Sequence, residues 1–210
     1  MNKYILILIA FGLLIIVSPA CKKKVRGCTD PSSSNYNSKA NEDDGSCNYL
    51  VVGDNFQGGK LAYILETGDD GYDPNIRHGL IAAPSDQSID ATWSNITNMA
   101  TNATSKTMGW GNKNTNTIVG LQGTGDYAAK ICSDLVLGGF SDWYLPSLNE
   151  LTKLYLNRNA IGGFAIPKGY WSSSESTIDK AWIQYFNTSS NSQFNPEKNT
   201  SYYVRAVRSF

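Results

Sequence analysis

Apolar residues recur at the spacing of a helix in the middle of the chain. The stronger pattern covers residues 126–137, and its apolar face consists of Tyr127, Ala128, Ile131, Cys132 and Leu135. A second helix is expected over 148–159, because Ser147 and Glu150 have the spacing of a capping box before an apolar run. Residues 115–121 also have helical character. The pattern therefore predicts two or three short helices.

Strand-like segments lie on both sides of this helical region. Residues 57–65 form a glycine turn leading into an apolar run, and turn residues at 69–75 predict that this run pairs with 79–84 as a hairpin. Further strand patterns follow the helices at 169–175, 181–187 and 201–210. The last is apolar enough to predict a packed strand and not a tail. Residues 88–116 are expected to form a long structured loop, and the polar segment 188–200 separates the last two strands.

The composition favours an extracytoplasmic binding module over a cytosolic enzyme. The 210 residues are 41% hydrophobic and 11% aromatic, which is enough for one moderate domain with appendages. The 18 basic and 18 acidic side chains cancel, so the chain lacks the basic footprint of a nucleic-acid-binding protein.

The N-terminus has the pattern of a secretory signal. Lys3 precedes an apolar run over residues 4–17 that is shorter than the about 20 residues of a membrane span. Two interpretations compete for cleavage between Ala20 and Cys21. If the signal is of the lipoprotein type, Cys21 is lipidated. If it is an ordinary signal with a small-x-small site at 18–20, Cys21 is left as a free thiol. An uncleaved anchor is the third alternative. We expect a signal peptide over 1–20, lipidation of Cys21 and a basic tether over 21–27.

This N-terminus predicts a bacterial cell-envelope protein. Lys22 is not an acidic retention-type residue, which favours an outer-membrane lipoprotein, either periplasmic or surface-exposed. The expected partners are the membrane, through the lipid anchor, and a glycan or surface protein. Homo-oligomerisation stays open.

Residues 28–49 form a separate small module. In an oxidising compartment Cys28 and Cys47 predict a disulfide, which stabilises a loop of this size by about 3 kcal/mol. The pattern resembles short GCTDP…DDGSC modules of secreted and surface proteins. Asp30, Asp43 and Asp44 are candidate calcium ligands, although the spacing does not fit an EF-hand and equally suits solvated turns. No other cofactor is expected.

Residues 53–210 carry an ordered series of motifs. These are QGGKLAYIL, HGLIAAPSDQS, QGTGDYAAKICSDL, GGFSDWYLPSLNEL, YWSSSE, AWIQYF and YYVRAVRSF. Together they resemble the bacterial domain of unknown function at the end of collagen-like adhesins, and the major paralogous domain family of surface proteins. The resemblance implies an α+β, C-type-lectin-like fold with small antiparallel sheets and paired terminal strands. Through the collagen-like adhesin, the resemblance also implies binding of sulfated glycans.

The candidate ligand-binding residues lie mostly in the last third of the chain. Sugar sites combine aromatic platforms with amides and carboxylates, because ring faces are apolar and hydroxyl groups need hydrogen-bond partners. The candidates are Glu175, Trp182, Tyr185, Asn187, Gln193, Asn195 and Arg205. A basic patch for acidic glycans is a further hypothesis, and its members would be Lys180, Lys198, Arg205 and Arg208. The calcium-site tripeptides of lectins are absent.

We expect no catalysis. Cys132 and His78 are the one pair with the chemistry of a nucleophile and a base, but Cys132 lies on the apolar helix face, where an inert buried cysteine belongs. The leading hypothesis is a glycan-binding lipoprotein. The second is a structural or protein-binding part of an outer-membrane assembly, and the third is an enzyme related to the formylglycine-generating enzymes.

Overall fold

The computed structural model describes residues 22–31, 33–96, 98–188 and 190–210, so the expectations for residues 1–20 and Cys21 lie outside the described residues. The elements of the described chain are β1 (Arg26–Gly27), β2 (Glu42–Asp43), β3 (Asn55–Phe56), β4 (Gly59–Ile64), β5 (Gly79–Ala82), β6 (Ser88–Ala91), α1 (Gly111–Gln122), α2 (Ala128–Ser133), α3 (Leu148–Leu156), α4 (Arg158–Ile161), β7 (Lys168–Glu175), β8 (Ala181–Phe186), β9 (Ser192–Phe194), β10 (Tyr202–Val204) and β11 (Val207–Ser209). Within these residues no helix is long and apolar enough to cross a membrane. The expected α+β class is confirmed.

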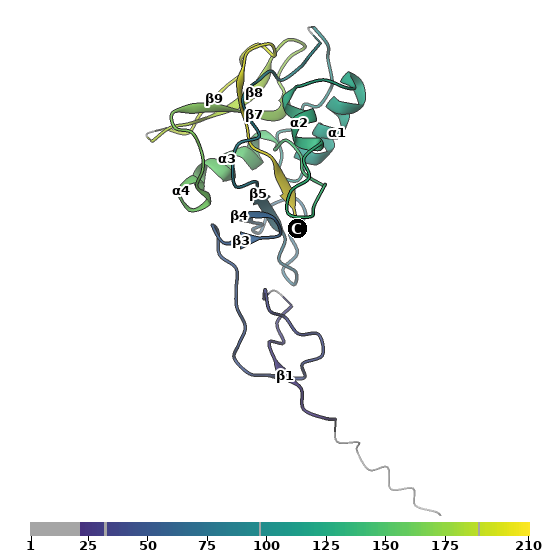
Figure 1. The fold of residues 1–210 in the computed structure, drawn as a ribbon, viewed down its shortest axis with the longest axis vertical. Coiled ribbons are helices and arrows are strands. Elements are labelled where there is room, and N and C mark those ends of the chain that lie inside the picture. Colours follow the sequence, from purple (N-terminus) through teal and green to yellow (C-terminus); the bar gives the residue numbers. More distant parts are fainter. Residues whose placement is uncertain (1–21, 32, 97, 189) are drawn as a thin grey trace, which may run out of the picture.

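Two sheets form the main body of the molecule (Figure 1). One has five strands in the order β6-β10-β7-β8-β9, and the other has four in the order β11-β5-β4-β3. The expected hairpin of β4 and β5 is confirmed, with antiparallel pairing. The sheets are mostly antiparallel, but β10 pairs with β7 in parallel, as β1 does with β2.

The last residues of the main body belong to both sheets. The single strand expected over 201–210 is two strands, since β10 lies between β6 and β7 while β11 pairs with β5. Val204, Ala206 and Val207 are fully buried, so this segment is packed as expected. The terminal strands share a sheet, but β5 separates β11 from β4, so they are not directly paired.

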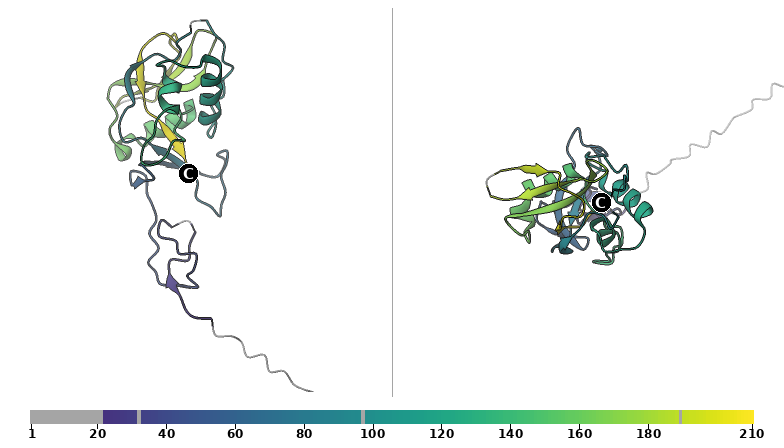
Figure 2. Two further views of the ribbon diagram at one scale, coloured as in Figure 1. Left: turned by 45° about the vertical axis from the view of Figure 1, so that its right-hand side comes forward. Right: turned by 90° about the horizontal axis from the view of Figure 1, so that it is seen from above.

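Helices cover both faces of the five-stranded sheet. Neighbouring residues of a strand point to opposite faces, and Tyr170 and Trp171 of β7 accordingly belong to different apolar clusters. Trp171 packs with residues of α1 and α2, whereas Tyr170 packs with Leu151 and Leu154 of α3. The two helix pairs flank the sheet in the figures (Figure 2).

The predicted capping box starts α3. The Ser147 hydroxyl accepts the Glu150 backbone N–H, and the Glu150 carboxylate accepts the Ser147 N–H. The helix stops at Leu156, and the separate turn α4 completes the segment expected as one helix. Two further segments expected as loops contain short strands, namely β6 and β9.

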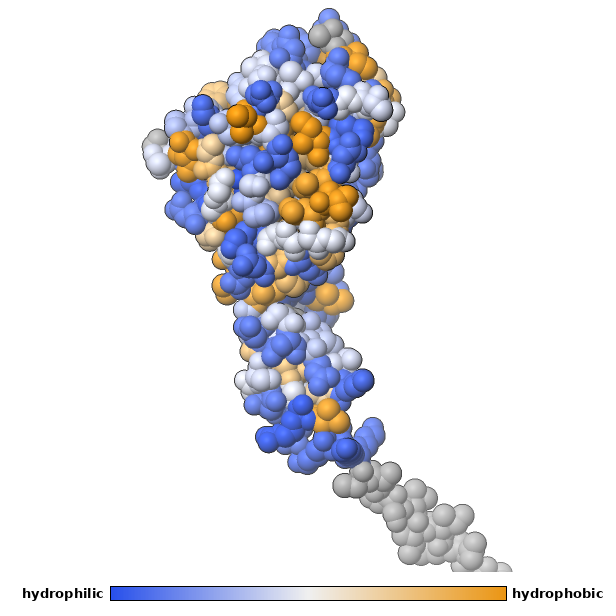
Figure 3. Space-filling view, viewed as in Figure 1, coloured by the Kyte–Doolittle hydropathy of each residue, from blue (hydrophilic) through white to orange (hydrophobic). Residues whose placement is uncertain are grey.

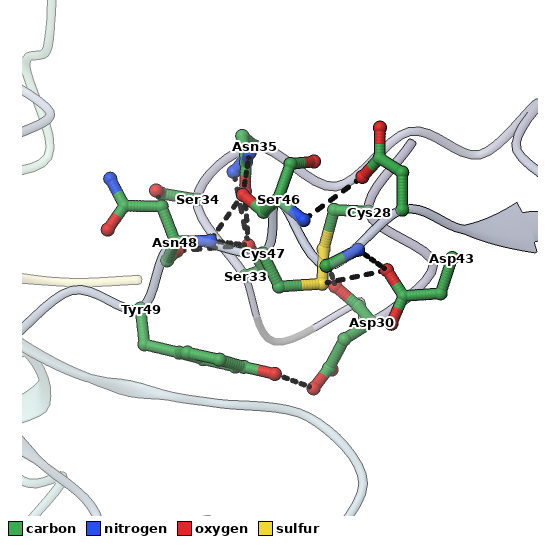
Figure 4. Close-up of a disulfide and its surroundings, with 12 residues drawn as sticks. Cys28, Asp30, Ser33, Ser34, Asn35, Asp43, Ser46, Cys47, Asn48 and Tyr49 are labelled. Atoms are coloured by element: carbon green, nitrogen blue, oxygen red, sulfur yellow. Dashed lines mark hydrogen bonds between the residues drawn. A yellow bond between two sulfur atoms is a disulfide. The ribbon is translucent and has the colours of Figure 1, made fainter. Parts of the chain in front are cut away.

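The N-terminal segment extends below the main body as a narrow, largely hydrophilic part (Figure 3). The predicted disulfide between Cys28 and Cys47 is present and closes it (Figure 4). Around it, the Ser33 hydroxyl donates to the Asn48 carbonyl and accepts the Asn48 N–H. Because few apolar side chains are buried here, covalent closure and polar contacts hold the segment.

Candidate functional site

The β8–β9 hairpin at the sheet edge carries most of the predicted ligand residues. Its register pairs Ile183 with Phe194, Gln184 with Gln193 and Tyr185 with Ser192. Because side chains alternate along a strand, Trp182 and Gln193 face the α3 side, whereas Tyr185 and Phe194 face away from it. Contacts agree with this arrangement, since Gln193 Nε2 donates to Thr152 Oγ1 of α3 at 2.9 Å. The sheet thus divides the predicted residues between two faces.

On the α3 side, Trp182 lies beneath an exposed lysine. Lys106 Nζ is 3.8 Å from the centroid of the partly buried Trp182 ring. Among the described residues, no carboxylate lies within ion-pair distance of Lys106. Such a cation–π contact is worth about 0.5–1 kcal/mol at an exposed site. The pair therefore offers an aromatic ring together with a positive charge that no carboxylate of the described residues neutralises.

Two exposed amides lie on the same side as Trp182. Gln193 uses its N–H groups on Thr152 and Gln184, while Asn195 Nδ2 donates to Ser176 Oγ at 3.1 Å. Within the described chain, the carbonyl oxygen of each amide receives no hydrogen bond. These oxygens are free to accept from hydroxyl groups of a ligand. We call Lys106, Trp182, Gln193 and Asn195 the tryptophan face.

Lys106 lies in the loop between β6 and α1, and a buried carboxylate binds the backbone in the first part of this loop. Glu175 Oε1 and Oε2 accept the backbone N–H groups of Thr101 and Asn102, each at 2.8 Å. Glu175 also pairs with Lys198, and both side chains are 4% exposed. Lys198 Nζ donates to the Met99 carbonyl as well. Glu175 therefore serves as an internal anchor, and its carboxylate oxygens are used on Lys198, Thr101 and Asn102.

A second buried carboxylate binds the backbone at the other end of this loop, next to α1. Glu150 accepts the N–H groups of Gly109 at 2.9 Å, Gly111 at 3.4 Å and Ser147 at 2.8 Å. Burial raises the pKa of Glu150 to about 7, although these hydrogen bonds oppose the shift. Between the two anchors, Asn149 N–H donates to the Lys106 carbonyl. The backbone beneath Lys106 is thus fixed before any ligand binds.

The same loop leads to a second lysine–tryptophan pair. Trp110 precedes the first residue of α1, and Lys113 Nζ lies 4.2 Å from the centroid of its ring. Lys113 is exposed and has no carboxylate within ion-pair distance among the described residues. The loop and the start of α1 therefore carry two such cations.

The four cations expected in a basic patch do not form one. Arg205 is fully buried, and it binds Asp86 and backbone carbonyls. Arg208 is buried against Asp142, and this hydrogen bond lowers the pKa of that carboxyl. Lys198 is the internal partner of Glu175, and Lys180 forms an ion pair with Glu197. These charges are neutralised within the chain.

Tyr185 and Asn187 lie away from the tryptophan face. The Tyr185 ring packs edge-on against Phe194, which is 53% exposed. Asn187 Oδ1 accepts the Ser190 N–H in the turn that follows β8. Of the predicted ligand residues, Trp182, Gln193 and Asn195 are brought together, and their ligand-binding role stays a prediction.

The three candidate calcium ligands make local contacts. Asp43 Oδ1 accepts the Gly45 N–H, and Asp44 Oδ1 accepts the Ser46 N–H, both patterns of turns. Asp30 accepts the Tyr49 hydroxyl at 2.8 Å. Over the described part of the chain, no group of three or more His, Cys, Asp or Glu side chains is arranged to hold a metal ion.

Cys132 is fully buried in the apolar cluster of α1 and α2, and burial raises the pKa of its thiol. His78 lies elsewhere, in the connection just before β5, and its Nδ1 is 3.2 Å from the Phe210 carbonyl oxygen. The pair thus lacks the mutual contact that activates a nucleophile.

Sequence reasoning missed the two lysines. Lys106 and Lys113 stand in a polar stretch, and neither has a charge pattern around it that marks a site. The one available signal is that Lys113 follows Trp110 by three positions at the start of a helix.

Comparison with known proteins gives one family and one similar fold. The sequence model described as the Lcl C-terminal domain matches residues 82–208. No curated protein matches the chain. Among solved structures, a fimbrial protein from Bacteroides ovatus ATCC 8483 is similar, with a TM-score of 0.55 at 14% sequence identity. At this identity the similarity concerns the fold alone. It covers 76% of this chain and 49% of the fimbrial protein, so the chain spans about half the length of that protein.

Proposed function

The chain belongs to the Lcl C-terminal domain family, and from this premise we propose that it is an exported envelope protein that binds an extracellular glycan without catalysis. In this proposal Cys21 carries the lipid anchor to the outer membrane, and residues 53–210 form the C-type-lectin-like binding domain. The observation that supports glycan binding is the tryptophan face, where an aromatic ring lies beside a cation and two exposed amides.

The chemistry of this face matches a sugar better than a purely apolar ligand. A sugar has an apolar ring face that stacks on an indole, and its hydroxyl groups donate to amide oxygens. Gln193 and Asn195 supply such oxygens from one strand and the residue after it. The two anchors of the loop at Glu175 and Glu150 reduce the entropy lost on binding.

The unpaired lysines favour a glycan that carries negative charge. Lys106 and Lys113 are exposed, whereas the buried cations are already neutralised by carboxylates. A sulfate or uronate group placed beside the Trp182 ring would gain the charge of Lys106 without displacing a protein carboxylate. Binding should therefore weaken as salt concentration rises.

Heparin binding by residues 22–210 tests this proposal. We expect Trp182→Ala and Lys106→Ala each to weaken binding at least tenfold, which corresponds to about 1.4 kcal/mol. Tyr185→Ala is the matched control, because it removes an aromatic ring from the opposite face of the same strand. Retention of heparin that is equal in all four proteins, or no retention at low salt, would refute the proposal.

A second candidate is a protein-binding role in an outer-membrane assembly. β9 is an edge strand, and its Phe194 is exposed beside Tyr185. Edge strands and exposed aromatic residues are features of protein interfaces. Crosslinking in the native membrane distinguishes the two candidates, since a stoichiometric protein partner lost on Phe194→Ser would favour this one.

A further inference from the structure

A hollow of about 260 Å³ lies between the β4–β5 connection and the end of β11, away from the residues of the tryptophan face. Its apolar lining includes Leu65, Leu80, Met108 and Phe210, and its polar lining includes Asp70 and His78. Its size suits a small molecule of one ring or a short chain, near the lower end of ordinary ligand pockets.

The walls of this hollow are mainly apolar and rigid. Leu80 is 2% exposed and Met108 is 5% exposed, so both are fixed in the core. The ring of Phe210 lies against Gly79, where an added Cβ would come within 2.7 Å of it. Phe210 also packs edge-on against Phe56 at a centroid distance of 5.3 Å, which holds its ring in place.

The polar groups of the hollow are hydrogen-bond acceptors. Asp70 is exposed at its rim and, among the described residues, has neither an ion pair nor a hydrogen bond. Its Oδ2 lies 3.9 Å from the position that a Cβ on Gly109 would occupy, so Asp70 is a direct neighbour of Gly109 in the lining of the hollow. His78 Nδ1 lies 3.2 Å from the backbone oxygen of Phe210, which only accepts, so Nδ1 donates to it and, in this tautomer, Nε2 is an acceptor.

We propose that this hollow binds a small apolar molecule that carries one primary or secondary amine. The apolar part occupies the space between Leu80, Met108 and Phe210. The ammonium group donates to the Asp70 carboxylate and to His78 Nε2, which together give it a charge-assisted contact and a second acceptor. Ser209 adds little, because its hydroxyl is engaged with the Tyr144 hydroxyl at 2.7 Å.

This inference does not rest on glycan binding. The hollow and the tryptophan face share no residue, although Met108 and Gly109 belong to the same loop as Lys106. The amine proposed for the hollow is also opposite in charge to the anionic glycan proposed for the tryptophan face. Failure of one proposal therefore leaves the other standing.

The test uses residues 22–210 with benzylamine, which is protonated at neutral pH, and benzyl alcohol, which has the same ring without the charge. We expect benzylamine to shift the NMR signals of the Leu80 and Met108 methyl groups and to bind about tenfold more tightly than the alcohol. Asp70→Asn should remove that difference while leaving binding of the alcohol unchanged. Glu66→Gln is the matched control, because Glu66 is an exposed acid of the same connection that does not line the hollow.

Three outcomes would overturn the proposal. The first is no methyl shift with benzylamine at millimolar concentration. The second is equal affinity for amine and alcohol in the unmodified protein. The third is a benzylamine affinity that Asp70→Asn and Glu66→Gln reduce by the same factor, which would show attraction by the acidic connection as a whole.

Discussion

The carboxylate of Glu150, in the first turn of α3, accepts the backbone N–H of Gly109 at 2.9 Å across 41 positions of the chain. The same side chain accepts the Ser147 N–H and so completes the capping box. One buried group therefore joins the start of a helix to the loop that presents Lys106 and leads to Trp110. The geometry of the tryptophan face depends on this link.

Glu150→Gln should lower the free energy of unfolding by about 2 kcal/mol, because the amide NH₂ would face backbone N–H groups that now donate to an oxygen. Urea unfolding followed by tryptophan fluorescence measures this change. Glu197→Gln, at an exposed carboxylate, is the control and should change stability by less than about 0.5 kcal/mol. An equal effect of both substitutions would contradict the anchoring role.

The contribution of Glu150 should also depend on pH. Burial raises its pKa from 4.5 to about 7, so the folded state binds the proton more tightly than the unfolded state. This contribution to stability is therefore fully present below pH 4.5 and is lost as the pH rises to about 7, by roughly 3 kcal/mol. Unfolding midpoints across this range should fall more steeply for the unmodified protein than for Glu150→Gln. Parallel curves would contradict the prediction.

Lys198→Met should cost about 3–5 kcal/mol, because it leaves the buried carboxylate of Glu175 without its cation. Lys180→Met is a matched control, since it breaks the exposed pair with Glu197, whose side chain is 53% exposed, and should cost less than about 1 kcal/mol. Thermal unfolding of both variants measures the difference. Similar melting temperatures would mean that the buried pair contributes no more than the exposed one.

Replacing Cys28 and Cys47 by serine should loosen the N-terminal segment alone. The loop closed by this disulfide is worth about 3 kcal/mol, and the segment has little apolar core to replace it. Hydrogen exchange should increase over residues 22–50 and stay unchanged in β4 and β5. Loss of protection in those strands would instead show that the segment stabilises the main body.

Local patterns were enough to predict the helix start at Ser147, the β4–β5 hairpin and the disulfide, because each depends on residues near in sequence or on a single cysteine pair. The division of 201–210 into two strands was missed. No turn residue between Val204 and Val207 marks the division in the sequence. The chain changes sheets there because β10 packs between β6 and β7 whereas β11 packs beside β5.

The candidate site was predicted in part for a similar reason. Strand alternation alone separates Trp182 from Tyr185, which are three positions apart, so this division was available from the sequence. The position of Lys106 was not, because it results from two buried carboxylates that bind a distant loop. Arg205 was a candidate either for ligand binding or for a structural ion pair with Asp142 or Glu175, and its guanidinium is in fact paired inside the fold with Asp86.

The placement of β10 and β11 has a consequence for the order of folding. β10 is the strand that joins β6 to β7, and β11 closes one edge of the other sheet. During synthesis neither sheet can be completed until residues 202–209 have left the ribosome. Both sheets are therefore completed only after translation of this segment, although β3, β4 and β5 and also β7, β8 and β9 can pair before it. A chain interrupted before this segment would expose β5, β6 and β7 as unpaired edges to other chains.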